Sequence, residues 1–572
     1  MMIRKLIKIT LTPILFSFFV ACDQKSPQQS LYALIDQYEN YKKADHSTYP
    51  LGDYREETIA AYADFCEVLK KQLIQLDPET LNEDDRISYE LLTFVLTHKV
   101  LAYEFKTHWN PILSDAGFHN NLTYNVRPIT SKNGALDYLK KLEAVPQYIE
   151  QQIALIRKGL EAGMGQPLVI FKGYESTYEM HITKTAEENF YYSPFLNLPE
   201  PITEKEKDSL QKAAADIVAS KIIPTFLQIK TFFETEYYPK TRTAIGVSST
   251  PKGKEYYQNR IDYYTTLSLT AEEIHTTGLE EVARIRKQME KIIAEVDYQG
   301  DFNAFIHFLR TDPQFYAKTP EELLMHARNI AKKLDEQLPR YFITLPRKPY
   351  GVAAVPDAIA PKYTGGRYVG TDPESSDPGY YWVNTYNLPS RPLYVLPSLT
   401  AHEAVPGHHL QGALNTELAD EIPQFRKDLY LSAYGEGWGL YTEYLAEEMG
   451  IYTTPYEHFG KLTYEMWRAC RLVVDTGIHA FGWSREQAVA FMAKNTALSL
   501  HEVNTEIDRY ISWPGQALAY KIGELKIKAL RKKVEEQQGT AFDIRAFHEL
   551  ILEKGTVTLP LLEQRVHQFL KP

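Results

Sequence analysis

Apolar residues recur at helical spacing along most of the chain. Ile149, Ile153, Ile156 and Leu160 lie three or four positions apart, and Gly163 follows them as a typical helix end. This spacing puts the four side chains on one face of a helix. The pattern predicts a helix that buries this face in a core.

A second long helix is predicted after residue 270. Thr270 and Glu273 have the spacing of a capping box, in which each side chain accepts a hydrogen bond from the other's backbone N–H. The apolar residues that follow form one stripe: Val282, Ile285, Met289, Ile292 and Val296. We interpret the stripe as a core face rather than a binding surface.

Strand-like sequence is concentrated at about 345–397. Gly365-Gly366 and Pro378-Gly379 are turn signals, and the aromatic run Tyr380–Val383 has high strand propensity. Leu393–Leu396 is a short apolar run between two prolines, as strands often are. The sequence therefore predicts a mainly α-helical protein with a small β-sheet just before the motif described below.

Two parts are predicted for the mature chain. A boundary near residue 240 separates an N-terminal helical half, residues 31–240, from a C-terminal half, residues 241–572. The C-terminal half carries every strong motif. We expect the two halves to form one continuous unit.

The first residues have the features of a lipoprotein signal peptide over 1–21. A basic start is followed by an apolar run over residues 9–20 that is too short for an ordinary membrane-spanning helix, and Cys22 follows a small residue. Residues 22–30 are polar enough for a tether. The sequence predicts lipidation of Cys22 and an extracytoplasmic bacterial lipoprotein anchored to a membrane, with plain secretion as the alternative.

Charge argues against a nucleic-acid partner. The formal net charge is −11, and loss of residues 1–21 removes three basic side chains and no acidic ones, which makes it −14. No basic field would then meet phosphates. Cys66 and Cys470 are the remaining cysteines after Cys22, too few for a disulfide framework, which a chain of 572 residues does not need.

The candidate chemistry is centred on residues 401–411. His402 with Glu403 beside it resembles the start of a zinc-peptidase His-Glu-x-x-His helix, but the next histidine, His408, comes six residues later. Pro406-Gly407 lies between, and proline removes a backbone amide, so a local bulge is expected. The bulge would bring His408 into register as the second ligand. His409 competes, but on an unbroken helix it would lie about 10.5 Å from His402.

Glu436 is the predicted third metal ligand, and Glu403 the predicted general base. Glu436 lies among three alternating glycines in the run 434–441. Each glycine costs about 1 kcal/mol of helix stability relative to alanine, so a close approach to the metal helix is expected there. Glu443 and Glu447 lie one face onward and are expected to orient ligands or to face solvent.

A polar row follows at Arg468, Arg471, Asp475 and His479. Arg471–Asp475 and Asp475–His479 both have i,i+4 spacing. Such a row among apolar neighbours predicts a buried network. It either orients the metal ligands or is a purely structural stripe of salt bridges.

A donor to the developing oxyanion is expected from the tyrosines after residue 508. Tyr510 is our first choice and Tyr520 the second, because a tyrosine hydroxyl is a suitable donor. Arg509 is expected either to meet a substrate carboxylate or to form an internal ion pair.

Four segments together resemble the bacterial DUF885 family, whose members are often lipoproteins: 265–275, 402–411, 436–438 and 509–523. The resemblance implies kinship with gluzincin metallopeptidases, hence a helical fold with a deep cleft and one zinc ion held by His402, His408 and Glu436. It also implies that Tyr510, which follows an arginine, stabilises the oxyanion. The chain differs from the wider gluzincin pattern at the inserted Pro406-Gly407.

These observations predict a zinc-dependent hydrolase that cleaves short peptides. Glu403 would deprotonate the water, and an edge strand within 363–387 would pair with the substrate backbone, with Asn384 and Thr385 as further cleft residues. The alternatives are a non-catalytic surface binding lipoprotein with a degenerate metal site, and a hydrolase of non-peptide amides or esters. The sequence contains no Gly-x-Ser-x-Gly elbow and no Gly-x4-Gly-Lys-Ser/Thr phosphate loop.

Overall fold

The computed structural model describes residues 26–571 apart from 43–47, 358, 361–362, 372–374, 376 and 419–421. The predicted signal peptide and Cys22 lie outside the described residues. Part of the predicted tether is helical, because Pro27 to Ser30 open the first helix and the apolar residues after them are buried in the core.

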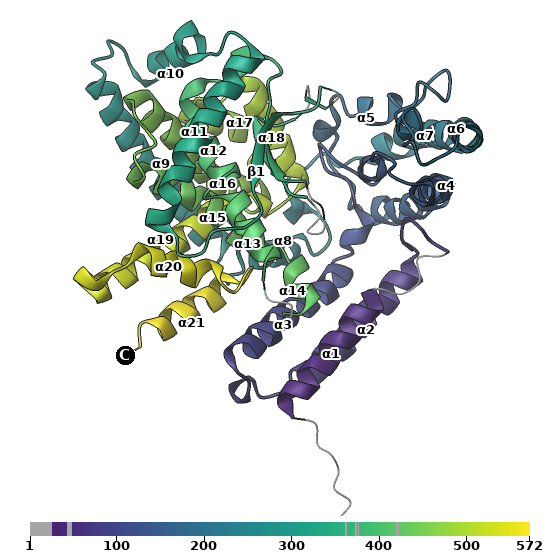
Figure 1. Ribbon diagram of the computed structural model, residues 1–572, viewed down its shortest axis with the longest axis horizontal. Helices are drawn as coiled ribbons and strands as arrows, with labels where there is room; N and C mark the ends of the chain where they lie inside the picture. The colour runs from purple at the N-terminus through teal and green to yellow at the C-terminus, as the bar shows by residue number, and fades with distance from the viewer. Residues whose placement is uncertain are drawn as a thin grey trace, which may run out of the picture.

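The helices that precede residue 240 are α1 (Pro27–Lys42), α2 (Glu56–Leu73), α3 (Glu83–Glu104), α4 (Lys132–Glu161), α5 (Ser176–Glu179), α6 (Glu204–Ile217) and α7 (Ile223–Phe232). Figure 1 shows α1–α3 as a slanted group and α4–α7 as a second group beside the main body. α4 and α7 share one hydrophobic core, to which Ile149 and Phe226 belong.

The helices that follow are α8 (Gly253–Thr265), α9 (Ala271–Glu295), α10 (Phe302–Thr311), α11 (Pro320–Tyr341), α12 (Leu396–Glu403), α13 (His408–Thr416), α14 (Gln424–Asp428), α15 (Ser432–Glu448), α16 (Pro455–His479), α17 (Arg485–Asn495), α18 (Leu500–Ser512), α19 (Ala519–Gln538), α20 (Ile544–Leu552) and α21 (Leu559–Phe569). Within the described ranges, no helix combines the length and apolarity that crossing a membrane requires. The predicted mainly helical fold is confirmed.

Both helices predicted from periodicity are present. α4 contains the Ile149–Leu160 stripe and ends just before Gly163, whose φ of +72° favours glycine. α9 begins with the predicted capping box, in which Thr270 N–H donates to Glu273 over 2.8 Å and Glu273 N–H donates to Thr270 Oγ1 over 3.2 Å. Its apolar stripe packs against α16.

A three-stranded sheet precedes α12, as predicted. The strands are β1 (Tyr350–Ala354), β2 (Gly366–Val369) and β3 (Gly379–Val383). β3 lies in the centre, parallel to β1 and antiparallel to β2. β3 alternates buried and half-buried residues, so one of its faces is in the core. β2 is an edge strand.

The predicted strand at Leu393–Leu396 is wrong. Leu393–Val395 is a 3-10 turn that leads into α12 at Leu396. Pro397 stands in the first turn of α12, where a missing backbone N–H costs nothing. Every residue of α12 is buried, so neither a period of two nor one of 3.6 was visible in the sequence.

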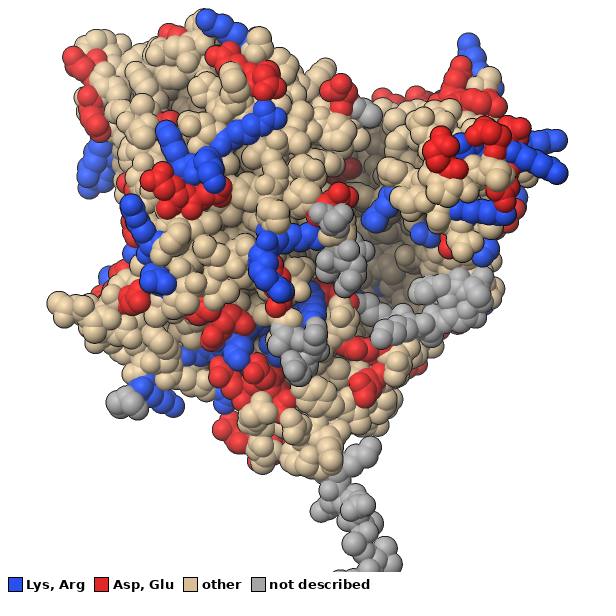
Figure 2. Space-filling model, in the orientation of Figure 1, with Lys and Arg blue, Asp and Glu red and all other residues tan. Residues whose placement is uncertain are grey.

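Residues from both sides of position 240 share two hydrophobic cores. One joins α4 and α7 to α9 and α16, and the other joins α1 and α3 to α15 and α20. Figure 2 shows acidic and basic side chains intermixed on one face, and this face is hollowed between the α4–α7 group and the main body. The boundary at 240, the deep cleft and the metallopeptidase-like fold stay predictions.

A buried cation holds three of the central helices together. Lys521 on α19 is fully buried, and its Nζ lies 2.9 Å from Glu465 on α16, 2.9 Å from Glu281 on α9 and 2.6 Å from Glu524. Burial alone would lower the pKa of Lys521, but these carboxylates raise it above its usual range. The ammonium group therefore stays charged and neutralises acids from three helices.

We expect Lys521→Met to lower the free energy of unfolding by about 3–5 kcal/mol, because it removes the buried cation that Glu281, Glu465 and Glu524 share. Guanidinium denaturation at pH 7 measures the change. The matched control is Lys532→Met, since Lys532 is 75% exposed and pairs with Glu536 at 3.7 Å; its effect should stay within about 0.5 kcal/mol. Equal losses in the two variants would contradict this account.

Candidate metal centre

The Pro406-Gly407 insertion breaks the helix instead of bulging it. α12 ends at Glu403 and α13 begins at His408, and the backbone of Ala404 and Gly407 leaves the helical region with ψ of −115° and −128°. A Cβ at Gly407 would collide with the His402 carbonyl oxygen, so the loop is tight enough to require glycine. The loop brings the rings of His402 and His408 to 4.7 Å between centroids.

α15 holds this loop in place. Trp438 Nε1–H donates to the Pro406 carbonyl oxygen over 2.8 Å, and Thr442 Oγ1–H donates to the Ala401 carbonyl oxygen over 3.0 Å. The Pro406 carbonyl lies in the loop between α12 and α13, and the Ala401 carbonyl lies in the last turn of α12. The same helix presents Glu436 to the two histidines.

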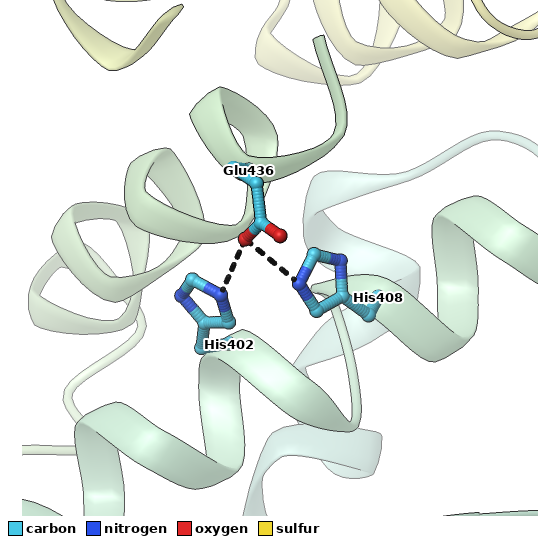
Figure 3. Close-up of side chains that lie close together, drawn as sticks. All are labelled: His402, His408 and Glu436. Atoms are coloured by element: carbon cyan, nitrogen blue, oxygen red, sulfur yellow. Dashed lines mark ion pairs between the residues drawn. The ribbon is translucent and has the colours of Figure 1, made fainter. Parts of the chain in front are cut away.

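His402, His408 and Glu436 lie together (Figure 3). Glu436 Oε2 is 3.5 Å from His402 Nε2 and 3.4 Å from His408 Nε2. Two ligands bound tetrahedrally at zinc distances are themselves about 3.3 Å apart. The donor set and its spacing therefore fit a zinc ion, and the 17% exposure of His408 and 16% of Glu436 leave a solvent side for a water.

Electrostatics favour a cation between these groups. Burial alone would raise the pKa of Glu436, but the adjacent histidines hold it well below its usual range. Burial alone would lower the pKa of His402, yet hydrogen bonds to Glu436 and Glu443 outweigh it and raise the pKa to about 10. The carboxylates thus make a strongly cation-attracting site.

Glu443 orients His402. Its Oε1 is 2.8 Å from His402 Nδ1, so Nε2 is the nitrogen that faces Glu436. Glu443 is buried, and Arg468 Nη2 lies 3.7 Å from the same oxygen. Of the two expectations for Glu443, orientation of a ligand fits this placement, whereas exposure to solvent does not.

Each of the three alternating glycines has its own neighbour. A Cβ at Gly439 would lie 2.7 Å from the His402 imidazole, at Gly437 2.5 Å from Gly523 Cα on α19, and at Gly435 2.5 Å from the Tyr430 ring. Close approach to the metal helix explains Gly439 alone. The other two make room for α19 and for Tyr430.

Glu403 follows His402 and contacts the sheet. Its Oε2 accepts a hydrogen bond of 2.8 Å from the Tyr368 backbone N–H on edge strand β2. Glu403 is 9% exposed. The Tyr368 N–H therefore bonds to the candidate base and not to the neighbouring strand β3.

His409 lies apart from the three candidate ligands. Its ring packs on Tyr350 and Tyr368, with centroids at 4.7 and 5.3 Å, and Nδ1 is 3.2 Å from the Tyr368 hydroxyl. Burial lowers the pKa of His409 to about 4, so it is neutral at pH 7. The structure gives it a packing role beside β2.

Tyr510 is buried in a closed hydrogen-bond network. Its hydroxyl donates to Glu506 Oε2 over 2.7 Å and accepts from Arg471 Nε over 2.7 Å and Trp467 Nε1 over 3.0 Å. The hydroxyl proton of Tyr510 is therefore donated to Glu506 and is not free for a substrate. Glu506 lies one turn before Tyr510 on α18, an i,i+4 spacing that sequence reasoning did not use.

Tyr520 has the more open hydroxyl. Among the described residues this hydroxyl has no hydrogen-bond partner, and the ring lies 4.4 Å from the Arg471 guanidinium. Burial has the largest effect on the pKa of Tyr430 and of Arg367. Glu403, Glu436 and Tyr520 all lie close enough to raise both pKa values electrostatically. Tyr520 is thus on the metal-centre side of α19.

The predicted bonds within the 468–479 row do not form. Asp475 accepts from the Tyr257 hydroxyl over 2.6 Å and the Gly515 N–H over 3.2 Å. His479 accepts from Val247 N–H over 3.0 Å at Nδ1 and donates to the Tyr510 carbonyl oxygen over 2.9 Å. The row is buried, as predicted, but it bonds to other elements because these offer closer partners than the next turn of α16.

Arg509 and Asn384 have internal partners. Arg509 donates to Gln516 over 2.9 Å and lies 3.5 Å from Glu506, which matches the ion-pair alternative. The Asn384 amide donates to carbonyl oxygens of Ala360 and Tyr363 within 3.0 Å and is fully buried. Asn384 therefore stabilises the loop before β2, and its expected cleft position is wrong.

Two residues near the centre were missed. Tyr430 is 53% exposed, and its hydroxyl donates to Glu436 Oε1 over 3.1 Å. Arg367 lies on β2. Desolvation of its guanidinium group lowers its pKa, but the nearby Tyr363, Glu403 and Glu436 outweigh this and raise the pKa above its usual range. The signal for Tyr430 was Gly435, which is bare because the ring lies on it. Arg367 is in the strand-like segment and had no such marker.

The family model described as "Bacterial protein of unknown function (DUF885)" matches residues 41–566. The chain belongs to the DUF885 family. No curated protein matches this DUF885 protein in sequence.

Two solved structures, both described as a "putative lipoprotein", are similar to this DUF885 protein. That from Colwellia psychrerythraea is 28% identical with a TM-score of 0.87, and 96% of this chain and 100% of that one are covered. That from Shewanella oneidensis, described as of unknown function, is 18% identical with a TM-score of 0.71, covering 94% and 99%. At 18% identity the second likeness shows the shared fold alone.

We expect Gly439→Ala to lower the zinc affinity of this DUF885 protein at least tenfold, because the new methyl group would push the His402 ring off its position. Competition with a zinc chelator measures the affinity. Gly134→Ala is the matched control, since Gly134 lies in α4 and an added Cβ would meet nothing nearer than Ser131 Oγ at 3.4 Å. Equal affinity of Gly439→Ala and the unmodified protein would show that His402 is not held by this contact.

Proposed function

We propose that this DUF885 protein is a zinc-dependent hydrolase that cleaves short peptides. The observation that carries the proposal is the convergence of His402, His408 and Glu436 at 3.4–3.5 Å with Glu403 on the adjoining turn. Three protein ligands, an open side and a neighbouring carboxylate are what a catalytic zinc site needs. Kinship with gluzincin peptidases belongs to the same proposal.

When bound, zinc would supply a Lewis acid for the water and for the scissile carbonyl. Glu403 takes the proton of the attacking water and delivers it to the leaving amine. Tyr368 N–H holds Oε2 of Glu403, so Oε1 is the oxygen that carries this proton. The strand thereby fixes the direction of proton transfer.

The oxyanion of the tetrahedral state needs a donor, and Tyr520 replaces our first choice, Tyr510. The Tyr510 proton is bound to Glu506, whereas the Tyr520 hydroxyl has no partner among the residues the structure describes. Arg367 on β2 adds positive charge beside Glu403 and Glu436. These groups act on charge that develops during reaction.

The edge of β2 is the proposed binding place for the peptide backbone. An extended peptide adds to a free edge through main-chain hydrogen bonds. Because Tyr368 N–H on this edge contacts Glu403, a peptide aligned along β2 passes close to the base.

We expect Glu403→Gln to lower peptide hydrolysis by at least about 100-fold while zinc content stays at one ion per chain, since the amide cannot accept the proton. Elemental analysis and turnover of a short-peptide mixture by purified full-length protein measure both quantities. Glu321→Gln, at a 67% exposed position on α11, is the control. Full activity of Glu403→Gln would rule out this mechanism, and a protein without zinc would favour a binding role.

We also propose an extracytoplasmic location with a lipid anchor on Cys22, which the lipoprotein descriptions of the two similar structures support. Cys22→Ala should move the protein from the membrane fraction to the soluble fraction. Retention of the variant in the membrane fraction would contradict the anchor.

A further inference from the structure

A group of arginines lies next to the metal centre on the side of Glu443. Arg468 and Arg471 are neighbours on one face of α16, with exposed fractions of 6% and 2%. Arg468 lies 3.7 Å from Glu443, the carboxylate that orients His402. Arg391, half-buried before α12, belongs to the same group because all three arginines act electrostatically on Glu502.

Each of these arginines has an unpartnered buried donor. Arg391 Nε, Arg468 Nε and Arg471 Nη1 are shielded from solvent and hydrogen-bond to nothing among the described residues. A buried donor left without an acceptor costs about 1–3 kcal/mol, and more when it is charged. Three such donors within one group point to an acceptor from outside the chain.

Positive charge exceeds negative charge around this group. Arg391, Arg468, Arg471 and Arg509 face three carboxylates, Glu443, Glu502 and Glu506. Burial, followed by repulsion from Glu506, raises the pKa of Glu502 to about 7, so this carboxyl is partly protonated at neutral pH. The four arginines and three carboxylates together therefore carry a net positive charge.

Aromatic rings hold the two guanidinium planes. The ring centroids of Trp467 and Tyr520 each lie 4.4 Å from the guanidinium carbon of Arg471, and that of Trp467 lies 4.4 Å from the guanidinium carbon of Arg468. Arg471 already donates through Nε to Tyr510 and through Nη2 to Glu506, so Nη1 is the donor that it can offer, while Arg468 and Arg391 each offer Nε. An anion with two oxygens can accept from donors of two different arginines.

We propose that Arg468 and Arg471 form a subsite for a carboxylate group of the substrate, adjoining the metal centre. The inference rests on the proposed hydrolase function and deepens it, since it selects peptides with a carboxylate near the cleaved bond. The carboxylate comes from the free C-terminus or from an acidic side chain. Tyr520 borders both the subsite and the reacting carbonyl, so it couples recognition to the oxyanion.

Binding by the inactive Glu403→Gln protein, loaded with zinc, tests the subsite without turnover. Titration calorimetry compares N-acetyl-trialanine with its C-terminal amide, and N-acetyl-Ala-Glu-Ala-amide with its Gln counterpart. At least one carboxylate peptide should bind tenfold or more tightly than its neutral partner. The peptide pair whose two members differ in affinity shows whether the carboxylate is a C-terminus or an acidic side chain.

Adding Arg471→Lys should reduce this discrimination to less than about threefold, because lysine keeps the charge but its single nitrogen cannot both pair with Glu506 and replace the free Nη1 donor. Arg328→Lys, at a 47% exposed position, should leave it unchanged. Zinc content and circular dichroism check that Arg471→Lys is folded. If it is not, Arg391→Gln replaces it, since Arg391 lies at the outer edge of the group and should weaken discrimination at least threefold.

Equal affinity for acid and amide in both pairs would overturn the subsite, and so would an absence of binding by every peptide. Discrimination that survives both arginine substitutions would overturn it as well. None of these results affects the hydrolase proposal, which stands or falls on zinc content and on turnover by the protein with Glu403 intact.

Discussion

The packing of α15 against the α12–α13 pair is the contact on which the candidate centre depends. On α15, Glu436 meets two histidines, Trp438 holds the Pro406 carbonyl, Gly439 touches His402, and Thr442 holds the Ala401 carbonyl. Three of these four contacts fix backbone or ring positions instead of binding metal. The ligands are therefore placed by packing before any ion arrives, which reduces the reorganisation that binding requires.

The helices behind this contact are joined by charge as well as by apolar burial. Lys521 neutralises acids from α9, α16 and α19, and Glu443 connects His402 to Arg468 of α16. Buried charges tolerate few alternative arrangements, because each must keep its partner. α16 thus contributes polar groups both to the junction of the helices and to the surroundings of the candidate centre.

The sequence was sufficient to single out three residues that come together at the candidate centre, and insufficient for their surroundings. His402, Glu403, His408 and Glu436 have local markers, namely a helical His-Glu pair, a proline-glycine break and a glycine-rich turn. Asp475 was placed by spacing along one helix and Tyr510 was chosen for its hydroxyl. Asp475 accepts a hydrogen bond from α8 and Tyr510 accepts two from α16, and no local pattern reveals these contacts. α12 could not be told from a strand because burial on every side removes periodicity.

The glycines around the centre set how far this part of the chain can vary. At Gly407, Gly437 and Gly439 a single added carbon would collide with the His402 carbonyl, with Gly523 or with the His402 ring. Any side chain is excluded at these positions on steric grounds alone, whatever its chemistry. Substitutions that retune the chemistry must therefore come from the rim, where Tyr430 and Arg367 are exposed, and exchange of Tyr430 would also remove a hydrogen bond to Glu436. Within this family we expect the ligand positions to be rigidly kept and substrate preference to diverge at that rim.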